Sequence, residues 1–215
     1  MFHQTLKAVS IFNKILTASG IVIAILVISG IYLYQNFSNE NKGKAVNISS
    51  SLKNGDLVLR RGRSVESFAV VYAKSENEYS HIGITVFENG KPFIIHIIPD
   101  SPSVVRKDTP EDFLSDKNSS RYCVLRPKFP ENVLKNVTKS AELFFEKHIL
   151  FDEKYNLSED AFMYCSELVL KAFTSNSIIL EDIKPQNLNF TWGKHEIIMP
   201  NSFVKSSHFT GVISG

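Results

Sequence analysis

The feature that most constrains the fold is a predicted β-hairpin at residues 81–98, HIGITVFENGKPFIIHII. Two β-rich runs flank Asn89 and Gly90, a pair typical of the two-residue turn of a hairpin. With this pair in the turn, His81 and His96 project from the same face of the sheet on neighbouring strands, because side chains alternate along a strand. The segment therefore predicts an antiparallel sheet that presents two imidazoles side by side.

Other segments add strands and helices around this hairpin. Short apolar runs bounded by glycine or proline predict strands, and apolar residues at helical spacing predict helices. Strands are predicted at 55–62, between two glycines, and at 121–127. A helix start is predicted at Thr109-Pro110, and helices over 130–149 and 165–176. The run FAVVYAKS at 68–75 fits either a helix or a strand. This order favours an α+β fold, with an antiparallel sheet packed against helices, over a doubly wound sheet.

The N-terminal part differs from this globular pattern. Residues 15–35 contain no charged side chain, and about 20 such residues are enough to cross a bilayer as a helix. The run ends in GIYLYQNFS, a poor site for a signal peptidase. We therefore predict one uncleaved transmembrane helix within an N-terminal anchor, residues 1–36. A polar linker, 37–51, and a catalytic domain, 52–215, complete the predicted organisation.

Charge and cysteine content restrict the partners and the compartment. The formal net charge of +2 is too small to indicate a nucleic-acid partner, and the basic run at 59–63 is predicted to be a solvated strand end. Lysines flank both sides of the apolar run, so their counts nearly balance and give little information on its orientation. By analogy with other short N-terminal anchors, we expect the domain to lie outside the cytoplasm, in a periplasm or at the cell surface. Cys123 is expected to be a small buried strand residue, with pairing to Cys165 left open.

Cys165 opens a predicted helix, and this position suits catalysis. Free amides and the positive dipole end at a helix N-terminus are expected to lower the pKa of a thiol and to hold an oxyanion. A sheet histidine can serve as the base, with a further polar group orienting it. Two imidazoles could instead bind a metal, but no third ligand stands at metal-binding spacing, so neither a metal nor another cofactor is predicted. A buried structural cysteine with unrelated histidines is the alternative.

A resemblance supports the catalytic reading. The segments NGDLVLRRG, YSHIGI, FIIHII, FDEKYNLSEDAFMYCSELVLKAF and IIMPNSF occur in this order over about residues 53–213. They resemble the YiiX/YebB-like group of circularly permuted papain-like cysteine hydrolases, within the NlpC-type superfamily. The resemblance implies a permuted papain-like fold, with Cys165 as nucleophile and His81 as general base.

The third residue of the site departs from the common pattern of that group. A glutamate often stands on the next strand, where this chain has His96, although the related lecithin:retinol acyltransferase-like proteins also use histidine there. Glu88 is a fallback for this role, but it lies beside the turn. Tyr164 is expected either to line the pocket and assist the oxyanion, or simply to pack.

The function predicted is thus a membrane-anchored amidase or endopeptidase-like enzyme that cleaves an amide or ester through Cys165, His81 and His96. The wider superfamily implies a cell-wall peptide as substrate, and its permuted branch also implies lipid-linked amides or esters. A catalytically silent module of the same fold, binding such a peptide or lipid, is the alternative. Substrate identity and oligomeric state are left open.

Several further residues receive structural predictions. Asp56 is expected to order the start of its strand, and Ser166 and Glu167 to suit a first helical turn. Asp152 and Tyr155 match the segment that precedes the nucleophile in the resembling group and are candidates for shaping the cleft. Surface positions are expected for His148, His195 and His208, and a core or cleft-wall position for Trp192.

Overall fold

The computed structural model describes residues 28–29, 48–72, 77–100, 102–190 and 193–215. The chain divides into two compact units, Met1–Asn41 and Lys42–Gly215. The second unit holds the sheet and the helices described below. The predicted membrane helix falls almost wholly outside the described residues, as does Trp192. Among the described residues, no helix is both long and apolar enough to cross a membrane.

An antiparallel sheet of six strands, in the order β10-β5-β1-β2-β3-β4, forms the centre of the second unit. The chain also forms two separate two-stranded sheets, β6-β7 and β8-β9. The strands are β1 Leu57–Arg61, β2 His81–Glu88, β3 Lys91–Ile97, β4 Val105–Asp108, β5 Arg121–Pro127, β6 Leu150–Phe151, β7 Phe162–Met163, β8 Gln186–Phe190, β9 Gly193–Ile197 and β10 Phe209–Ser214.

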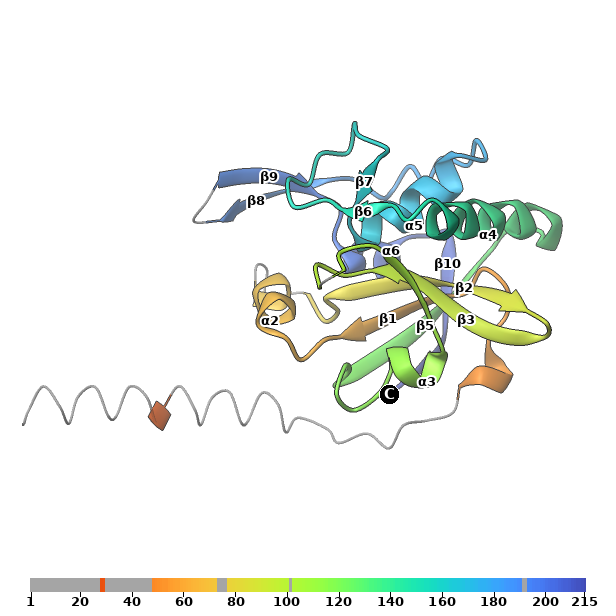
Figure 1. Cartoon of the computed structure of the whole chain (residues 1–215), viewed down its shortest axis with the longest axis horizontal. Coiled ribbons are helices and arrows are strands. Elements are labelled where there is room, and N and C mark those ends of the chain that lie inside the picture. The colour runs from red at the N-terminus through yellow and green to blue at the C-terminus, as the bar shows by residue number, and fades with distance from the viewer. Residues whose placement is uncertain (1–27, 30–47, 73–76, 101, 191–192) are drawn as a thin grey trace, which may run out of the picture. The chain divides into compact units, whose positions relative to one another are not determined.

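The helices cover both faces of the central sheet (Figure 1). They are η1 Ser49–Ser51, α2 Val65–Tyr72, α3 Pro110–Phe113, α4 Glu131–Glu146, α5 Cys165–Thr174 and α6 Pro200–Lys205. Helices α4 and α5 pack on one face, where Leu57, Ile82 and Ile84 enter the main core. The short helix α3 covers the other face, where Phe113 packs with Val58 and Ile94. The sheet is therefore buried on both sides, and its polar positions must be satisfied internally.

The hairpin forms as the sequence predicts. Asn89 and Gly90 have φ values of 51° and 78°, which matches a type I′ turn. Glu88 pairs with Lys91, and the same register continues along β2 and β3. A residue with positive φ at each turn position suits the twist of the two strands, so this short pair determines which side chains face each other.

Most other predicted elements are also present, and two details differ. Thr109 caps α3, because its Oγ1 accepts a hydrogen bond from the Asp112 amide at 3.1 Å. The ambiguous run at 68–75 contributes to α2, which ends at Tyr72. The prediction of a solvated strand end at 59–63 is wrong for Arg60, which is only 7% exposed. Its strand is central in the sheet, and both faces of that sheet are covered.

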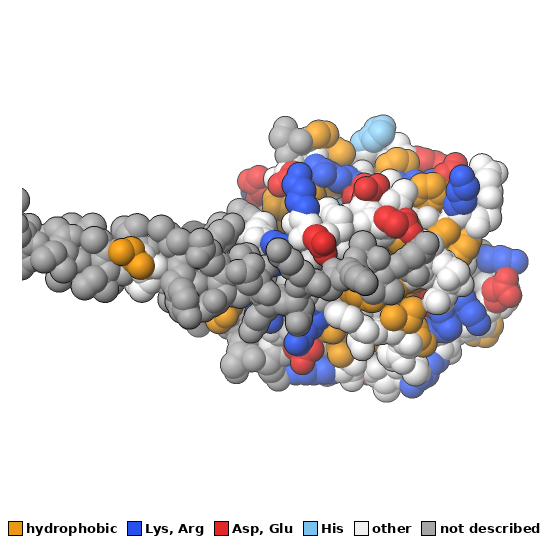
Figure 2. All heavy atoms as spheres, turned by 90° about the horizontal axis from the view of Figure 1, so that it is seen from below, with side chains coloured by type: hydrophobic (Ala, Val, Ile, Leu, Met, Phe, Trp, Pro, Cys, Tyr) orange, Lys and Arg blue, Asp and Glu red, His pale blue; other side chains and the backbone are white. Residues whose placement is uncertain are grey.

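The surface of the described part carries charges of both signs. On the face in Figure 2, Lys and Arg side chains are interspersed with Asp and Glu, and apolar side chains lie between them. No extended area of one charge appears on this face among the residues that are described. Such a mixed surface is typical of a globular domain with small net charge.

Candidate active site

Cys165 is the first residue of α5, as predicted, and its side chain is partly exposed. Tyr164 is the N-cap residue, and its amide donates to Glu167 Oε2 at 3.3 Å. The first amides of a helix have no intrahelical partner. They are therefore directed toward the sulfur and the space in front of it, where an oxyanion would develop.

The pKa of the Cys165 thiol is raised, which is opposite to the predicted shift. Burial of the sulfur is the largest cause, and it outweighs hydrogen bonds from the Ser166 side chain and from the backbone of Ile82, Ser166 and Cys165 itself. Ser166 Oγ lies 3.9 Å from Sγ. The resting thiol is thus neutral, and the nearby donors stabilise the thiolate only once a proton is removed.

His81 belongs to a chain of hydrogen-bonded side chains on three successive strands. His81 Nε2 lies 2.9 Å from His96 Nδ1, and His96 Nε2 lies 2.9 Å from Asp108 Oδ2. These residues come from β2, β3 and β4. Asp108 was not among the predicted site residues, because nothing local shows that β4 pairs beside the hairpin.

The charge state of this relay follows from its surroundings. Burial, the Arg60 cation and His96 hold the pKa of His81 well below its ordinary value of 6.5. Burial also lowers the pKa of His96, although its hydrogen bond to Asp108 opposes the shift. The same hydrogen bond lowers the pKa of Asp108. At neutral pH the relay is therefore two neutral imidazoles and one carboxylate.

The tautomers then follow from the hydrogen-bond inventory. The Asp108 carboxylate can only accept, so His96 Nε2 carries the proton and His96 Nδ1 is an acceptor. His81 Nε2 must therefore donate to His96, and the lone pair of His81 stands on Nδ1. Cys165 lies close by, since the backbone of Ile82, the residue after His81, hydrogen-bonds to its sulfur. His81 Nδ1 is thus the basic atom of the site.

Cys165, His81 and Tyr164 line one cavity of about 470 Å³. Tyr164 is 3% exposed, and its hydroxyl accepts a hydrogen bond from the Ile198 amide at 2.9 Å. Its ring packs edge-on against Tyr155, which also lines the cavity. Tyr164 therefore forms part of the wall and holds Ile198 in place.

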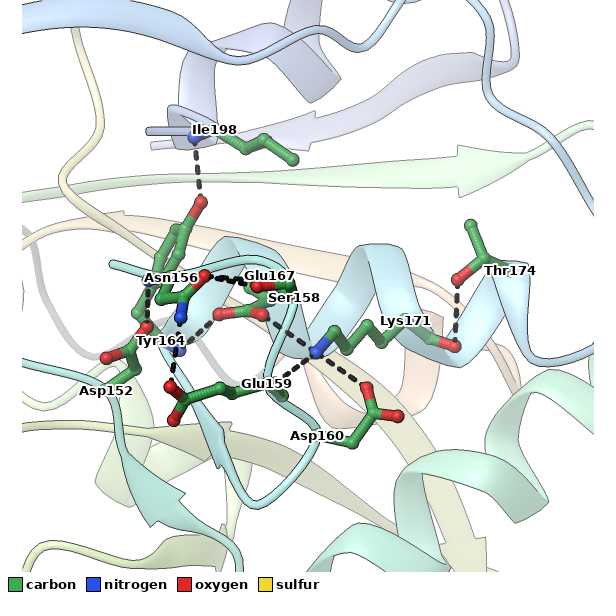
Figure 3. A network of polar contacts seen from close by, with 10 residues as sticks. All are labelled: Asp152, Asn156, Ser158, Glu159, Asp160, Tyr164, Glu167, Lys171, Thr174 and Ile198. Atoms are coloured by element: carbon green, nitrogen blue, oxygen red, sulfur yellow. Dashed lines mark hydrogen bonds and ion pairs between the residues drawn. The ribbon is translucent and has the colours of Figure 1, made fainter. Parts of the chain in front are cut away.

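The loop before Cys165 is attached to α5 by polar contacts (Figure 3). Asp152 is 4% exposed and accepts hydrogen bonds from the amides of Lys154 and Asn156. Lys171 of α5 reaches back to Asp160 at 2.8 Å and to Glu167 at 3.0 Å. These contacts position the loop that contributes Glu153 and Tyr155 to the cavity.

The remaining predicted residues have clear places. Glu88 lies outside the relay and pairs with Lys107 at 2.7 Å. Asp56 accepts from the Lys53 amide and from Arg126, which orders the start of β1 as predicted. Cys123 is a buried free thiol, and Cys165 is free as well.

Only one of the three histidines expected at the surface is fully exposed. His148 is exposed. His195 packs against Tyr155, and His208 stacks on Phe129 and lies 3.1 Å from Glu181, so both are only partly exposed. Within the described part of the chain, no three His, Cys, Asp or Glu side chains are grouped so as to hold a metal ion.

Comparisons with known proteins agree with this fold. A family model described as "Permuted papain-like amidase enzyme, YaeF/YiiX, C92 family" matches residues 51–213. The crystal structure of metalloprotein yiiX from Escherichia coli O157:H7 is 19% identical and superposes with a TM-score of 0.64, over 76% of this chain and 97% of that one. At this identity the likeness shows the fold alone. No curated protein matches the chain. Because this family model matches well over half of the chain, the chain belongs to the permuted papain-like amidase family.

Proposed function

We propose that the chain is a membrane-anchored cysteine hydrolase that cleaves an amide or ester bond through Cys165, His81 and His96. The observation that carries the proposal is the hydrogen-bonded relay that ends at His81, next to the partly exposed thiol that opens α5. The relay leaves a lone pair on a neutral imidazole, and the helix supplies amides for an oxyanion. A nucleophile, a base and an orienting group are the parts that covalent catalysis needs.

The reaction begins with proton transfer, because the resting thiol and imidazole are both neutral. His81 Nδ1 removes the Sγ proton as the sulfur attacks the substrate carbonyl carbon. The carbonyl oxygen becomes an oxyanion held by the free amides at the start of α5. The imidazolium then protonates the leaving amine or alcohol, and a thioester on Cys165 remains. Water, deprotonated by His81, then attacks the thioester carbon, the C–S bond breaks and the acid is released, and the Cys165 thiolate regains its proton from His81.

The Asp108 carboxylate stabilises the imidazolium state through His96. When His81 Nδ1 gains a proton, the positive charge is shared with a partner that is itself hydrogen-bonded to a carboxylate at 2.9 Å. A positive charge in this buried place is otherwise costly, since Arg60 lies beside it. No cofactor takes part in this scheme.

Anchoring and location are part of the proposal and rest on the sequence. The uncharged run at residues 15–35 supports a single membrane-spanning helix, with the catalytic domain outside the cytoplasm. A domain held there can reach cell-wall peptides or lipid-linked amides and esters, and we propose these as the substrate class.

The test uses p-nitrophenyl acetate, an activated ester that needs little substrate recognition. Full-length Cys123→Ala protein should release a burst of p-nitrophenolate equal to the amount of protein, with an acetyl group on Cys165 by peptide mass spectrometry. The Cys165→Ala change should abolish the burst, and His81→Ala should slow it about 100-fold or more.

A matched comparison separates catalysis from folding. His148→Ala alters an exposed histidine and should leave the burst unchanged. If the Cys165→Ala protein still shows the burst, or if the folded Cys123→Ala protein shows none, the hydrolase proposal is wrong. The second result would favour a binding module on the same fold.

A further inference from the structure

Arg60 is a buried cation inside the candidate active site. Its side chain is 7% exposed, and it lines the same cavity as Cys165 and His81. On β1 it pairs directly with His81 of β2, so both side chains leave the same face of the sheet. Burial lowers the pKa of Arg60 to about 10, and the guanidinium therefore stays charged at neutral pH.

The hydrogen-bonding capacity of this guanidinium is mostly unused. Nη1 donates to the Phe113 carbonyl at 2.6 Å, and the group lies 4.4 Å above the Phe113 ring. Nε is buried and has no hydrogen-bond partner. Among the described residues, no ion pair of Arg60 is found within 4.0 Å, and Asp108 already pairs with His96. A buried charge in this condition is costly unless something else compensates it.

The groups around Arg60 compensate its charge only through space. Asp108, Asp100 and Cys165 favour its charged form, and Arg106 disfavours it. Of these, Asp108 makes its short contact with His96 and acts on Arg60 only through space, and Cys165 is a neutral thiol before catalysis. Asp100 is an exposed residue at the cavity wall. The open side of Arg60 is therefore the cavity itself.

We propose that Arg60 binds a negatively charged group of the substrate, a carboxylate or a phosphate, next to the scissile carbonyl. A guanidinium presents several N–H donors in a planar fork that matches either anion. The bound anion pairs with the guanidinium where Arg60 lines the cavity and neutralises the cation beside His81. The substrate is thus an amide or ester with an anionic group close to the bond that is cleaved.

The inference rests on the proposed function in that the cavity is taken as the substrate site, but its test needs no turnover. The probes are iodoacetate and iodoacetamide, which alkylate Cys165 by the same displacement of iodide and differ in a carboxylate. Both rates depend equally on the thiolate fraction, so their ratio reports binding of the carboxylate alone. All proteins are full-length and carry Cys123→Ala.

The Arg60→Gln change should lower the ratio of the iodoacetate rate to the iodoacetamide rate at least about tenfold, since a charge-assisted hydrogen bond is lost. Arg60→Lys keeps the charge, so its rate ratio should lie between that of the protein with Arg60 intact and that of Arg60→Gln. The control is Arg61→Gln, the next residue of the same strand, which points to the other face and should leave the ratio unchanged. Circular dichroism verifies that each variant is folded.

A second measurement uses the Cys123→Ala protein with Arg60 intact, so that the test does not depend on the folding of Arg60 variants. Acetate or inorganic phosphate, at constant ionic strength, should slow labelling by iodoacetate, and the more effective anion identifies the favoured group. The proposal is overturned if neither anion slows labelling of Cys165 by iodoacetate. It is also overturned if folded Arg60→Gln slows labelling by both reagents equally, which would mean that Arg60 stabilises only the thiolate. The ester burst is independent of these results, so each proposal can fail by itself.

Discussion

At the residue scale, the main finding is that two further residues orient His81, the proposed base. His96 contacts His81 and fixes its tautomer, and Asp108 fixes the tautomer of His96 in turn. The hairpin register places the two histidines together, as the sequence predicts. The carboxylate comes from β4, which reaches the hairpin only after the segment of residues 98–104. No spacing rule connects Asp108 to His81, and this explains why sequence reasoning stopped at His96.

The Asp108→Asn change should reduce the rate of the ester burst by about 10- to 100-fold. An amide cannot stabilise the imidazolium by its charge, and it offers His96 a donor as well as an acceptor. The measurement is the burst rate with p-nitrophenyl acetate in the Cys123→Ala background. Glu88→Gln is the control, since Glu88 pairs with Lys107 at the exposed end of the hairpin. Equal effects of the two changes would contradict the relay.

At the element scale, α5 does more than present the thiol. Its Glu167 is fully buried and connects the Tyr164 amide to Lys171, which holds the preceding loop through Asp160 (Figure 3). Glu167 was predicted only as a favourable acid in a first helical turn. Its larger role depends on Lys171, one turn further along the helix, and on a loop that folds back over both.

Burial raises the pKa of Glu167 from 4.5 to about 7, more than the attraction of Lys171 lowers it. The folded chain therefore holds more protons than the unfolded chain between these two values. The free energy of unfolding should then fall as the pH rises through this window, by up to about 3 kcal/mol from this group. Urea unfolding followed by near-UV circular dichroism at about pH 5 and about pH 7 measures the difference.

The Glu167→Gln change should remove most of this pH dependence, because a glutamine does not titrate and still accepts from the Tyr164 amide. The matched control is Glu159→Gln on the exposed part of the same loop. If the slope between the two pH values persists in Glu167→Gln, another group is responsible for it.

At the scale of the whole molecule, the second unit explains the chemistry and the apolar run explains the proposed location. The relay and the nucleophile lie on different elements, and the cavity forms where they meet. The run at residues 15–35 has the length of a membrane span. We therefore expect this run to anchor the chain in a membrane, which fractionation tests.

The Leu26→Arg change should shift the chain from the membrane fraction to the soluble fraction after alkaline carbonate extraction. A charge in the middle of a span costs about 2.5–3.5 kcal/mol on insertion scales. Gln35→Arg places the same charge at the end of the run, where it can reach the interface, and should leave the fractionation unchanged. A wild-type chain extracted by carbonate would contradict the anchor.

The sequence by itself determined what depends on neighbours along the chain. An Asn-Gly pair sets the hairpin register, a threonine before a proline begins α3, and helical spacing after Cys165 places the thiol at a helix start. Local backbone preferences and side-chain periodicity suffice for each of these. The sequence also shows that the histidine precedes the cysteine, and the resemblance to the family depends on this order.

Only the tertiary structure decided the electrostatics of the site. The sequence predicted a lowered thiol pKa from the helix end alone, whereas burial under distant segments raises it. It placed Arg60 in solvent, whereas β1 lies at the centre of a sheet covered on both faces. Burial and the distance between charges depend on contacts between residues far apart in the chain. For that reason, no local pattern contained the Asp108 relay or the buried guanidinium beside His81.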